Sequence, residues 1–219
     1  MIIKSDWEFG VLNVYNYKQS GKLDGYFDFI RNNHTNIEGD ICEVGVYRGS
    51  SIIATALLLK ELNSNKKVYG FDSFSGFPSY HENDNHFKFE ELFREDKISE
   101  KQYQDYLLNV GHKEFMIGKS VNSSTISTSA DFSETSLSFL EKKIEYLELD
   151  NIILVDGDYK STMTNKVYEN NQFMSALIDC DLYESHKIAL PFVWDRMVND
   201  GYMYLDEYYS LKFPGARIA

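Results

Sequence analysis

The part of the chain that fixes its architecture is residues 41–50, which read ICEVGVYRGS. The first four residues are apolar apart from one glutamate and lead into a glycine, a pattern typical of a buried strand that ends in a turn. Ser50 and Ser51 offer an N-cap for an apolar helix over residues 52–62. Residues 68–72, VYGFD, read as a second strand. Strand, helix and strand in this order form a βαβ unit, which predicts a parallel sheet with a right-handed crossover.

The same alternation continues through the rest of the chain. Three further strands are predicted, at residues 152–155, 174–179 and 202–206. Two further helices are predicted, at residues 137–147 and 185–197. A short helix nearer the N-terminus follows from the i, i+3, i+4, i+7 spacing of four apolar residues, Leu23, Tyr26, Phe27 and Ile30. We therefore expect an α/β fold with a doubly wound, mostly parallel, Rossmann-like sheet that has helices on both faces.

Residues 78–130 interrupt this alternation. They are polar, carry three histidines and are helical only in part, over residues 89–108. A connection of this length is too long for a simple loop in a compact domain and is typical of a lid, a binding loop or an oligomer contact. Regular structure is expected to resume where Asp131 and Glu134, which have capping-box spacing, precede the next helix.

The length and charge of the chain limit what it can bind. Its 219 residues fit one ordinary domain, residues 39–219, preceded by an aromatic and partly helical segment, residues 1–38, which we expect to contact substrate or the second subunit of a homodimer. Lys and Arg number 22 and Asp and Glu 34, a net charge of −12 that argues against binding nucleic acid or an anionic membrane. No apolar run resembles a signal peptide or a membrane span, so the expected location is the cytoplasm.

Some residues are expected to be structural only. Cys42 and Cys180 lie in apolar, strand-like runs, and two cysteines are too few for a disulfide framework, so both are predicted to be buried thiols. Lys142 and Lys143 are expected on a solvated helix face.

Carboxylates stand at or near the end of every predicted strand. In open α/β sheets, ligands bind beyond the carboxyl ends of the strands, so these side chains are the candidates for chemistry. A converging set of carboxylates indicates bound cations or hydroxyl-rich ligands. The set consists of Glu43, Asp72, Asp156, Asp158, Asp179, Asp181, Asp206 and Glu207.

The first turn between strand and helix indicates which ligand this is. Glu43 occupies the first glycine position of the dinucleotide motif G-x-G-x-x-G, where a carboxylate would repel a pyrophosphate. Asp72 ends the second strand, where a carboxylate can accept hydrogen bonds from ribose hydroxyls. A nucleoside cofactor that carries a cation and no phosphate, such as S-adenosylmethionine, satisfies both conditions. The alternative is that Gly45 and Gly49 only permit a tight turn and close helix packing.

Five strings of the sequence together resemble the macrocin O-methyltransferase family, from about residue 40 to the end. They are EVGVYRGS at 43–50, FDSFSGFP at 71–78, IDCDLYES at 178–185, LDEY at 205–208 and PGAR at 214–217. The resemblance implies a class I methyltransferase that uses S-adenosylmethionine and a divalent metal, commonly Mg²⁺. Its substrate would be a sugar hydroxyl, on a nucleotide sugar or on a glycosylated natural product.

The resemblance also implies roles for individual residues. Asp179 would bind the metal and would serve as, or assist, the general base, with Asp206 and Glu207 as the other metal ligands. Asp158 either borders the adenine or lies in a plain surface loop. With Asp158, the predicted cofactor site comprises Glu43, Gly45, Val46, Tyr47, Gly49, Ser50, Asp72, Ser73 and Phe74.

The chain departs from the family's pattern in three places. Glu207 stands where the family usually has a second aspartate. His186 stands where the family usually has threonine, and it is either a second catalytic base or a histidine on the helix surface. The family continues with a helix and two antiparallel strands that close the sheet, and we expect these to be missing from this chain, which stops after Pro214 and five further residues.

Two other functions stay open on the sequence. Asp179-Cys180-Asp181 matches the D-x-D motif of a metal-dependent glycosyltransferase, which accounts for the carboxylates but not for the turn at Glu43. A non-catalytic subunit that retains the methyltransferase fold is the other alternative.

Overall fold

The computed structural model describes residues 3–219, which form two compact units. Unit 1 holds the chain up to Phe74 together with residues 135–179 and 188–205. Unit 2 holds residues 75–134, 180–187 and 206–219. The predicted insertion, residues 78–130, falls wholly in unit 2.

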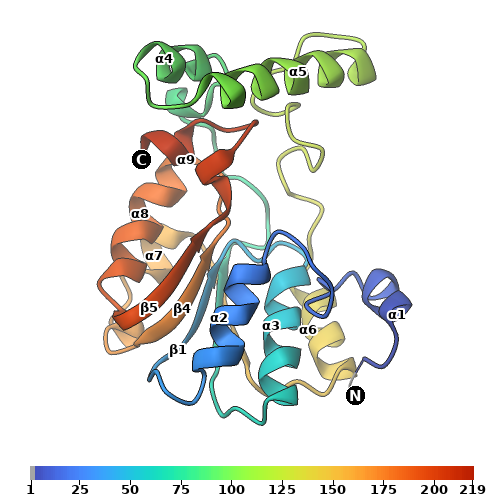
Figure 1. The fold of residues 1–219 in the computed structure, drawn as a ribbon, viewed down its shortest axis with the longest axis vertical. Coiled ribbons are helices and arrows are strands. Elements are labelled where there is room, and N and C mark those ends of the chain that lie inside the picture. The colour runs from blue at the N-terminus through green and yellow to red at the C-terminus, as the bar shows by residue number, and fades with distance from the viewer. Residues whose placement is uncertain (1–2) are drawn as a thin grey trace. The chain divides into compact units, whose positions relative to one another are not determined.

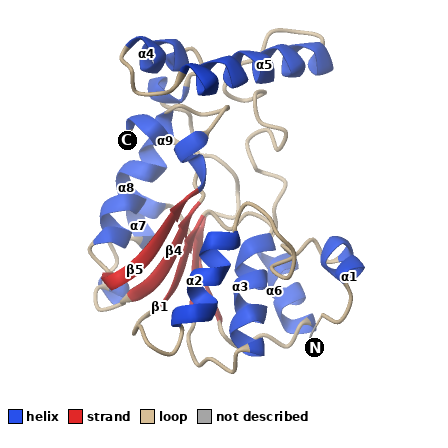
Figure 2. Cartoon of the chain, in the orientation of Figure 1, coloured by secondary structure: helices blue, strands red, loops and turns tan. Residues whose placement is uncertain are grey.

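Unit 1 is built on a five-stranded sheet in which every pair of neighbours is parallel (Figure 2). The strand order is β3-β2-β1-β4-β5, so the chain starts in the middle of the sheet and winds toward each edge in turn. This confirms the predicted α/β fold. The strands are β1 (Asp40–Val44), β2 (Val68–Asp72), β3 (Ile152–Asp156), β4 (Phe173–Ile178) and β5 (Met197–Leu205).

Helices cover both faces of this sheet (Figure 1). One face carries α2 (Asp24–Asn33), α3 (Ser50–Glu61) and α6 (Leu137–Tyr146), and α1 (Asp6–Val11) lies beyond them. The other face carries α7 (Tyr159–Thr162) and the part of α8 (Tyr183–Trp194) that belongs to unit 1. A short 3-10 helix, η2 (Lys166–Tyr168), precedes β4.

Burial on both faces explains why the strands read as apolar runs. On the first face, Tyr26 and Ile30 of α2 pack with Ile52 of α3 against the sheet, and all three are fully buried. On the other face, the ring of Phe71 in β2 meets that of Phe192 in α8 edge-on, with centroids 5.3 Å apart. The helix predicted from the spacing of Leu23 to Ile30 is confirmed as α2.

Unit 2 contains the remaining helices. The predicted single helical region, residues 89–108, is two helices that pack on each other through buried Phe89, Leu92 and Tyr106. They separate because Asp96 takes a left-handed conformation and the Ser99 hydroxyl accepts the Gln102 N–H as a new cap. The helices of this unit are η1 (Glu82–Asp84), α4 (Lys88–Arg94), α5 (Glu100–Ile117), the start of α8, η3 (Asp206–Tyr209) and α9 (Gly215–Ile218).

Two predicted helix caps are wrong. The N-cap of α3 is Gly49, and Ser50 is already helical, because the backbone at residue 49 has a φ of +77° that favours glycine. The N-cap of α6 is Ser136, whose hydroxyl accepts the N–H of Phe139, so the predicted capping box of Asp131 and Glu134 does not form.

The buried thiols are as predicted, since Cys42 and Cys180 are both free and buried. Over residues 3–219, no helix combines the length and the apolar content needed to cross a bilayer. The largest differences from the predicted bounds are in α8, which spans Tyr183–Trp194 rather than residues 185–197, and in β5, which begins at Met197 rather than at residue 202.

Truncating the sheet core should cost more stability than truncating an exposed aromatic residue of the same unit. Phe71 is fully buried, so Phe71→Ala should lower the free energy of unfolding by about 3–5 kcal/mol. Trp194 is 73% exposed, so Trp194→Ala should change it by less than about 0.5 kcal/mol. Urea denaturation of both variants measures the difference, and equal effects would contradict the assigned packing.

Candidate functional site

The turn between β1 and α3 is held in an unusual backbone conformation. Gly45, Tyr47 and Gly49 all have positive φ, of 90°, 51° and 77°. A Cβ on Gly49 would also come within 2.3 Å of a methyl carbon of Leu140. A larger residue at this position would strain the backbone and would also force the Leu140 side chain to shift.

Asp72 fixes this turn from the end of β2. One carboxylate oxygen accepts the backbone N–H groups of Val46 and Tyr47, at 2.7 and 2.8 Å. The other oxygen accepts the N–H of Phe74 at 2.7 Å. Three of about four acceptor positions are then in use, so the carboxylate has room for one more hydrogen bond. Asp72 could therefore accept a hydrogen bond from only one ribose hydroxyl.

The carbonyl groups of the same turn are bound by residues from other segments. The Thr135 hydroxyl donates to the carbonyl of Tyr47 at 2.6 Å. The ammonium of Lys143 donates to the carbonyls of Arg48, Leu12 and Asn13, at 3.1, 3.1 and 3.3 Å. Lys143 is 8% exposed, so its predicted place on a solvated helix face is wrong. Its three acceptors are the reason that it is buried, because a buried ammonium needs its donors satisfied.

Glu43 is a buried carboxylate beside this turn. Its Oε1 accepts the hydroxyl of Ser51 at 2.6 Å, whereas its Oε2 has no hydrogen-bond partner among residues 3–219. Burial raises the pKa of Glu43 to about 8; the Ser51 hydrogen bond opposes this rise, and the charges of Asp179 and Asp72 add to it. A buried oxygen of this kind is a position for a cationic or hydrogen-donating ligand group.

The other predicted cofactor residues lie along the same edge of the sheet. Ser73 and Phe74 follow β2, and Phe74 is buried with a positive φ of 46°. Asp158 follows β3 and caps α7, with its carboxylate accepting the N–H of Lys160 at 2.7 Å. The predicted cofactor residues of unit 1 thus lie in or just after the last residues of β1, β2 and β3.

Unit 2 contains a pair of buried carboxylates, Asp181 and Glu207, which offer oxygens within 4.8 Å of each other. Asp181 has a left-handed backbone with φ of 55°, and its carboxylate meets the ammonium of Lys212 at 3.3 Å. Oxygen donors from carboxylates are the ligands that Mg²⁺ prefers, so the pair fits a hard divalent cation. Asp181 was not among the predicted metal ligands, although its place as the second aspartate of the D-x-D motif could have indicated this role.

The remaining predicted residues are placed as follows. Asp179 directly follows β4, and its N–H donates to the carbonyl of Val44 at 2.8 Å. Asp206 is the first residue of η3, beside Glu207 in sequence. Both stay predicted metal ligands.

His186 is buried in the first part of α8, so a position on the helix surface is wrong. Its Nδ1 lies 3.0 Å from the carbonyl oxygen of Leu182 and 3.5 Å from the sulfur of Cys180. Burial lowers the pKa of this histidine, which favours the neutral imidazole. Its predicted role as a second base stays a prediction.

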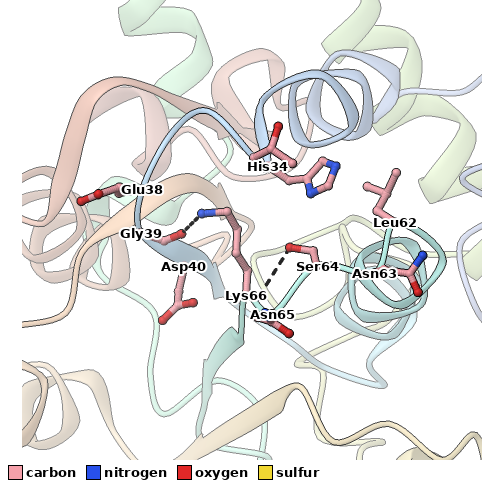
Figure 3. Close-up of a pocket in the computed structure, with 10 residues that line it drawn as sticks. His34, Glu38, Gly39, Asp40, Leu62, Asn63, Ser64, Asn65 and Lys66 are labelled. Atoms are coloured by element: carbon pink, nitrogen blue, oxygen red, sulfur yellow. Dashed lines mark hydrogen bonds between the residues drawn. The ribbon is translucent and has the colours of Figure 1, made fainter.

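A pocket of about 560 Å³ lies elsewhere on unit 1 (Figure 3). Its walls come from residues 34–35, 38–40 and 62–66, at the amino-terminal ends of β1 and β2. Lys66 crosses it and donates to the carbonyls of Ile37 and Gly39. Because ligands of open α/β sheets bind at the carboxyl ends of strands, this pocket is not the predicted cofactor site.

Comparisons with known proteins bear on the resemblance found in the sequence. The model of the Macrocin-O-methyltransferase (TylF) family matches residues 22–117, just under half of the chain. This confirms the resemblance over a range that includes the turn at Glu43 and the end of β2. No curated protein matches the chain in sequence.

Solved structures show the same fold. A crystal structure of CalS11, a calicheamicin methyltransferase, is 18% identical with a TM-score of 0.60, covering 98% of this chain and 70% of that one. The O-methyltransferase NovP is 18% identical with a TM-score of 0.59, covering 89% and 68%. The chain therefore has the fold of O-methyltransferases.

The raised pKa of Glu43 should make stability depend on pH in a defined direction. Between the ordinary pKa of 4.5 and about 8, the folded chain keeps a proton that the unfolded chain has released, so the free energy of unfolding falls as pH rises. The Glu43→Gln variant has no titrating group at this position, so its free energy of unfolding does not fall for this reason as pH rises. Its stability relative to wild type should therefore increase by a few kcal/mol between about pH 5 and about pH 8.

Urea denaturation across this pH range measures the effect. The control is Glu141→Gln, which changes the same kind of side chain at an exposed position of α6. A difference between wild type and Glu43→Gln that does not change with pH would contradict the raised pKa.

Proposed function

We propose that this chain transfers a methyl group from S-adenosylmethionine to a sugar hydroxyl. The proposal is supported by the match of residues 22–117 to the macrocin O-methyltransferase family model and by the methyltransferase fold. The observation that carries the proposal is Glu43, a fully buried carboxylate with one unpartnered oxygen at the carboxyl end of β1. In its ionised form, this carboxylate would repel a phosphate and would be stabilised by a bound cation.

The residues of unit 1 fit this cofactor. S-adenosylmethionine carries a sulfonium and an ammonium group, and either supplies the positive charge that an ionised, buried Glu43 needs. Asp72 has one acceptor position left for a ribose hydroxyl, while Ser73, Phe74 and Asp158 border the adenosine. The cofactor supplies the methyl group, and the chain's residues orient it against the acceptor oxygen.

The carboxylates that follow β4 and β5 fit a divalent metal, for which we propose Mg²⁺. Asp181 and Glu207 are proposed as metal ligands because their carboxylate oxygens lie close together. Asp179 and Asp206 are proposed as ligands because of their places in the sequence motifs. When bound, a hard cation would supply Lewis acidity that lowers the pKa of the acceptor hydroxyl. We assign Asp179 as the general base that would take the hydroxyl proton as the methyl group passes from the sulfonium to the oxygen and S-adenosylhomocysteine is released, with His186 as the second candidate.

We propose a nucleotide sugar or a glycosylated natural product as the acceptor, and a homodimer as the working form. The comparisons lend no support to the alternative of a D-x-D glycosyltransferase, because CalS11 and NovP, which share the fold, are methyltransferases. The fold does not distinguish an enzyme from a non-catalytic subunit, so this alternative has to be tested by measuring methyl transfer.

Cofactor binding should depend on Glu43 and on its ionisation. Glu43→Gln should weaken the binding of S-adenosylhomocysteine roughly 10- to 100-fold, because a charge-assisted hydrogen bond to its ammonium group is lost. Wild-type affinity should also decline as pH falls below about 8, since protonated Glu43 no longer attracts a cation, whereas the affinity of Glu43→Gln should change little.

Isothermal titration calorimetry between pH 6 and 9 measures both effects, with Glu141→Gln as the control that should bind as wild type does. Equal affinity of Glu43→Gln and wild type would argue against the assigned cofactor site. Tight binding of UDP or GDP in place of S-adenosylhomocysteine would favour the glycosyltransferase.

Methyl transfer should require both a sugar acceptor and the metal. Incubation with labelled S-adenosylmethionine and a panel of nucleotide sugars should give a methylated product that disappears in EDTA and returns with excess Mg²⁺. Full activity in EDTA would exclude the metal role. No transfer to any acceptor, despite cofactor and metal binding, would favour the non-catalytic subunit.

A further inference from the structure

We propose that Asp84 is a positioning residue for the carboxylate pair Asp181 and Glu207, and that it acts through the first residue of α8. The inference rests on the proposed function, because it treats the pair as metal ligands. All the residues that carry it belong to unit 2.

The N-terminus of α8 is capped from a distant part of the chain. The residue that precedes the helix, Leu182, has no side-chain oxygen and cannot accept a hydrogen bond from the first turn. Instead, Oδ1 of Asp84 accepts the N–H of Tyr183 at 2.7 Å, across 99 residues of sequence. A carboxylate at this end is also favoured by the dipole of the helix.

The second oxygen of Asp84 holds its own segment in place. Oδ2 accepts the N–H of His81 at 2.8 Å, which closes the capping box of η1. The side chain is 1% exposed, so water does not compete for these bonds. The imidazole of His81 stacks on the ring of Tyr183, with centroids 4.6 Å apart. Asp84 and His81 thus bind the same residue of α8 in two ways.

Gly215, at the start of α9, packs closely against Asp84 and Tyr183. A Cβ on Gly215 would lie 2.1 Å from Oδ1 of Asp84 and 2.8 Å from Cβ of Tyr183. Only glycine allows this approach, which gives a physical reason for the glycine of the PGAR string. Three separate segments therefore meet at the Asp84–Tyr183 bond.

This bond bears on Asp181, which lies two residues before Tyr183. Asp181 has a left-handed backbone, a conformation that costs a non-glycine residue energy and persists only where its surroundings enforce it. By fixing the chain at Tyr183, Asp84 constrains the direction in which Asp181 presents its carboxylate to Glu207. Side chains that orient metal ligands in this way affect metal affinity without touching the metal.

The test is the metal affinity of Asp84→Asn in the full chain. Asparagine has nearly the same shape but retains only one acceptor oxygen, so one of the two N–H groups loses its partner. We expect the dissociation constant for Mn²⁺, measured by calorimetry, to rise about 10-fold or more. The affinity for S-adenosylhomocysteine should not change, because its proposed residues lie in unit 1.

Two further variants make the result specific. Gly215→Ala places a methyl group against Asp84 and should weaken Mn²⁺ binding in the same selective way. Glu82→Gln removes an exposed charge from the same 3-10 helix and should leave both affinities as in wild type.

Unchanged Mn²⁺ affinity in Asp84→Asn would overturn the inference. Equal loss of Mn²⁺ and S-adenosylhomocysteine binding would also overturn it, since that pattern belongs to general destabilisation. A wild-type chain that binds no Mn²⁺ would instead refute the metal in the proposed function, and the inference with it.

Discussion

Three backbone N–H groups share the carboxylate of Asp72, and the geometry of the candidate cofactor site depends on this arrangement. Two of them belong to the turn after β1 and one to the turn after β2. The two turns are far apart in sequence, and Asp72 ties them together at one edge of the sheet. With its carbonyls held by Thr135 and Lys143, the turn after β1 is bound on both its N–H and its carbonyl side.

Glu43 differs from Asp72 in what its carboxylate lacks. Both carboxylate oxygens of Asp72 accept backbone N–H groups, whereas Oε2 of the buried Glu43 has no hydrogen-bond partner among residues 3–219. A buried carboxylate oxygen without a hydrogen-bond partner is rare at purely structural positions and is more typical of binding sites. This difference between the two acids, one with most of its acceptor positions used by backbone N–H groups and one with an unpartnered oxygen, was not visible in the sequence, where both were expected to contact the cofactor.

Much of the fold was predictable because its signals are local. The βαβ unit at residues 41–72 could be derived from apolar runs, and the amphipathic helix from the spacing of Leu23 to Ile30. Predictions failed where a distant contact overrides local preference. Ser50 is a good cap by composition, but the left-handed backbone at Gly49 ends the turn one residue earlier. Lys143 looked solvated because its three acceptor carbonyls come from segments more than 90 residues away.

Unit 2 is assembled from three stretches of chain, residues 75–134, 180–187 and 206–219, with residues 135–179 and 188–205 of unit 1 encoded between them. The contact of Asp84 with Tyr183 and Gly215 therefore closes loops of about 100 and 130 residues, whose ordering entropy must be overcome before the contact forms. Contacts of such high sequence separation slow folding. During synthesis, helices α4 and α5 can pack on each other as soon as both have left the ribosome, but Leu211 and Ile218, which also pack against them, are made much later. Until then, part of the apolar surface of the two helices is exposed to chaperones or to aggregation.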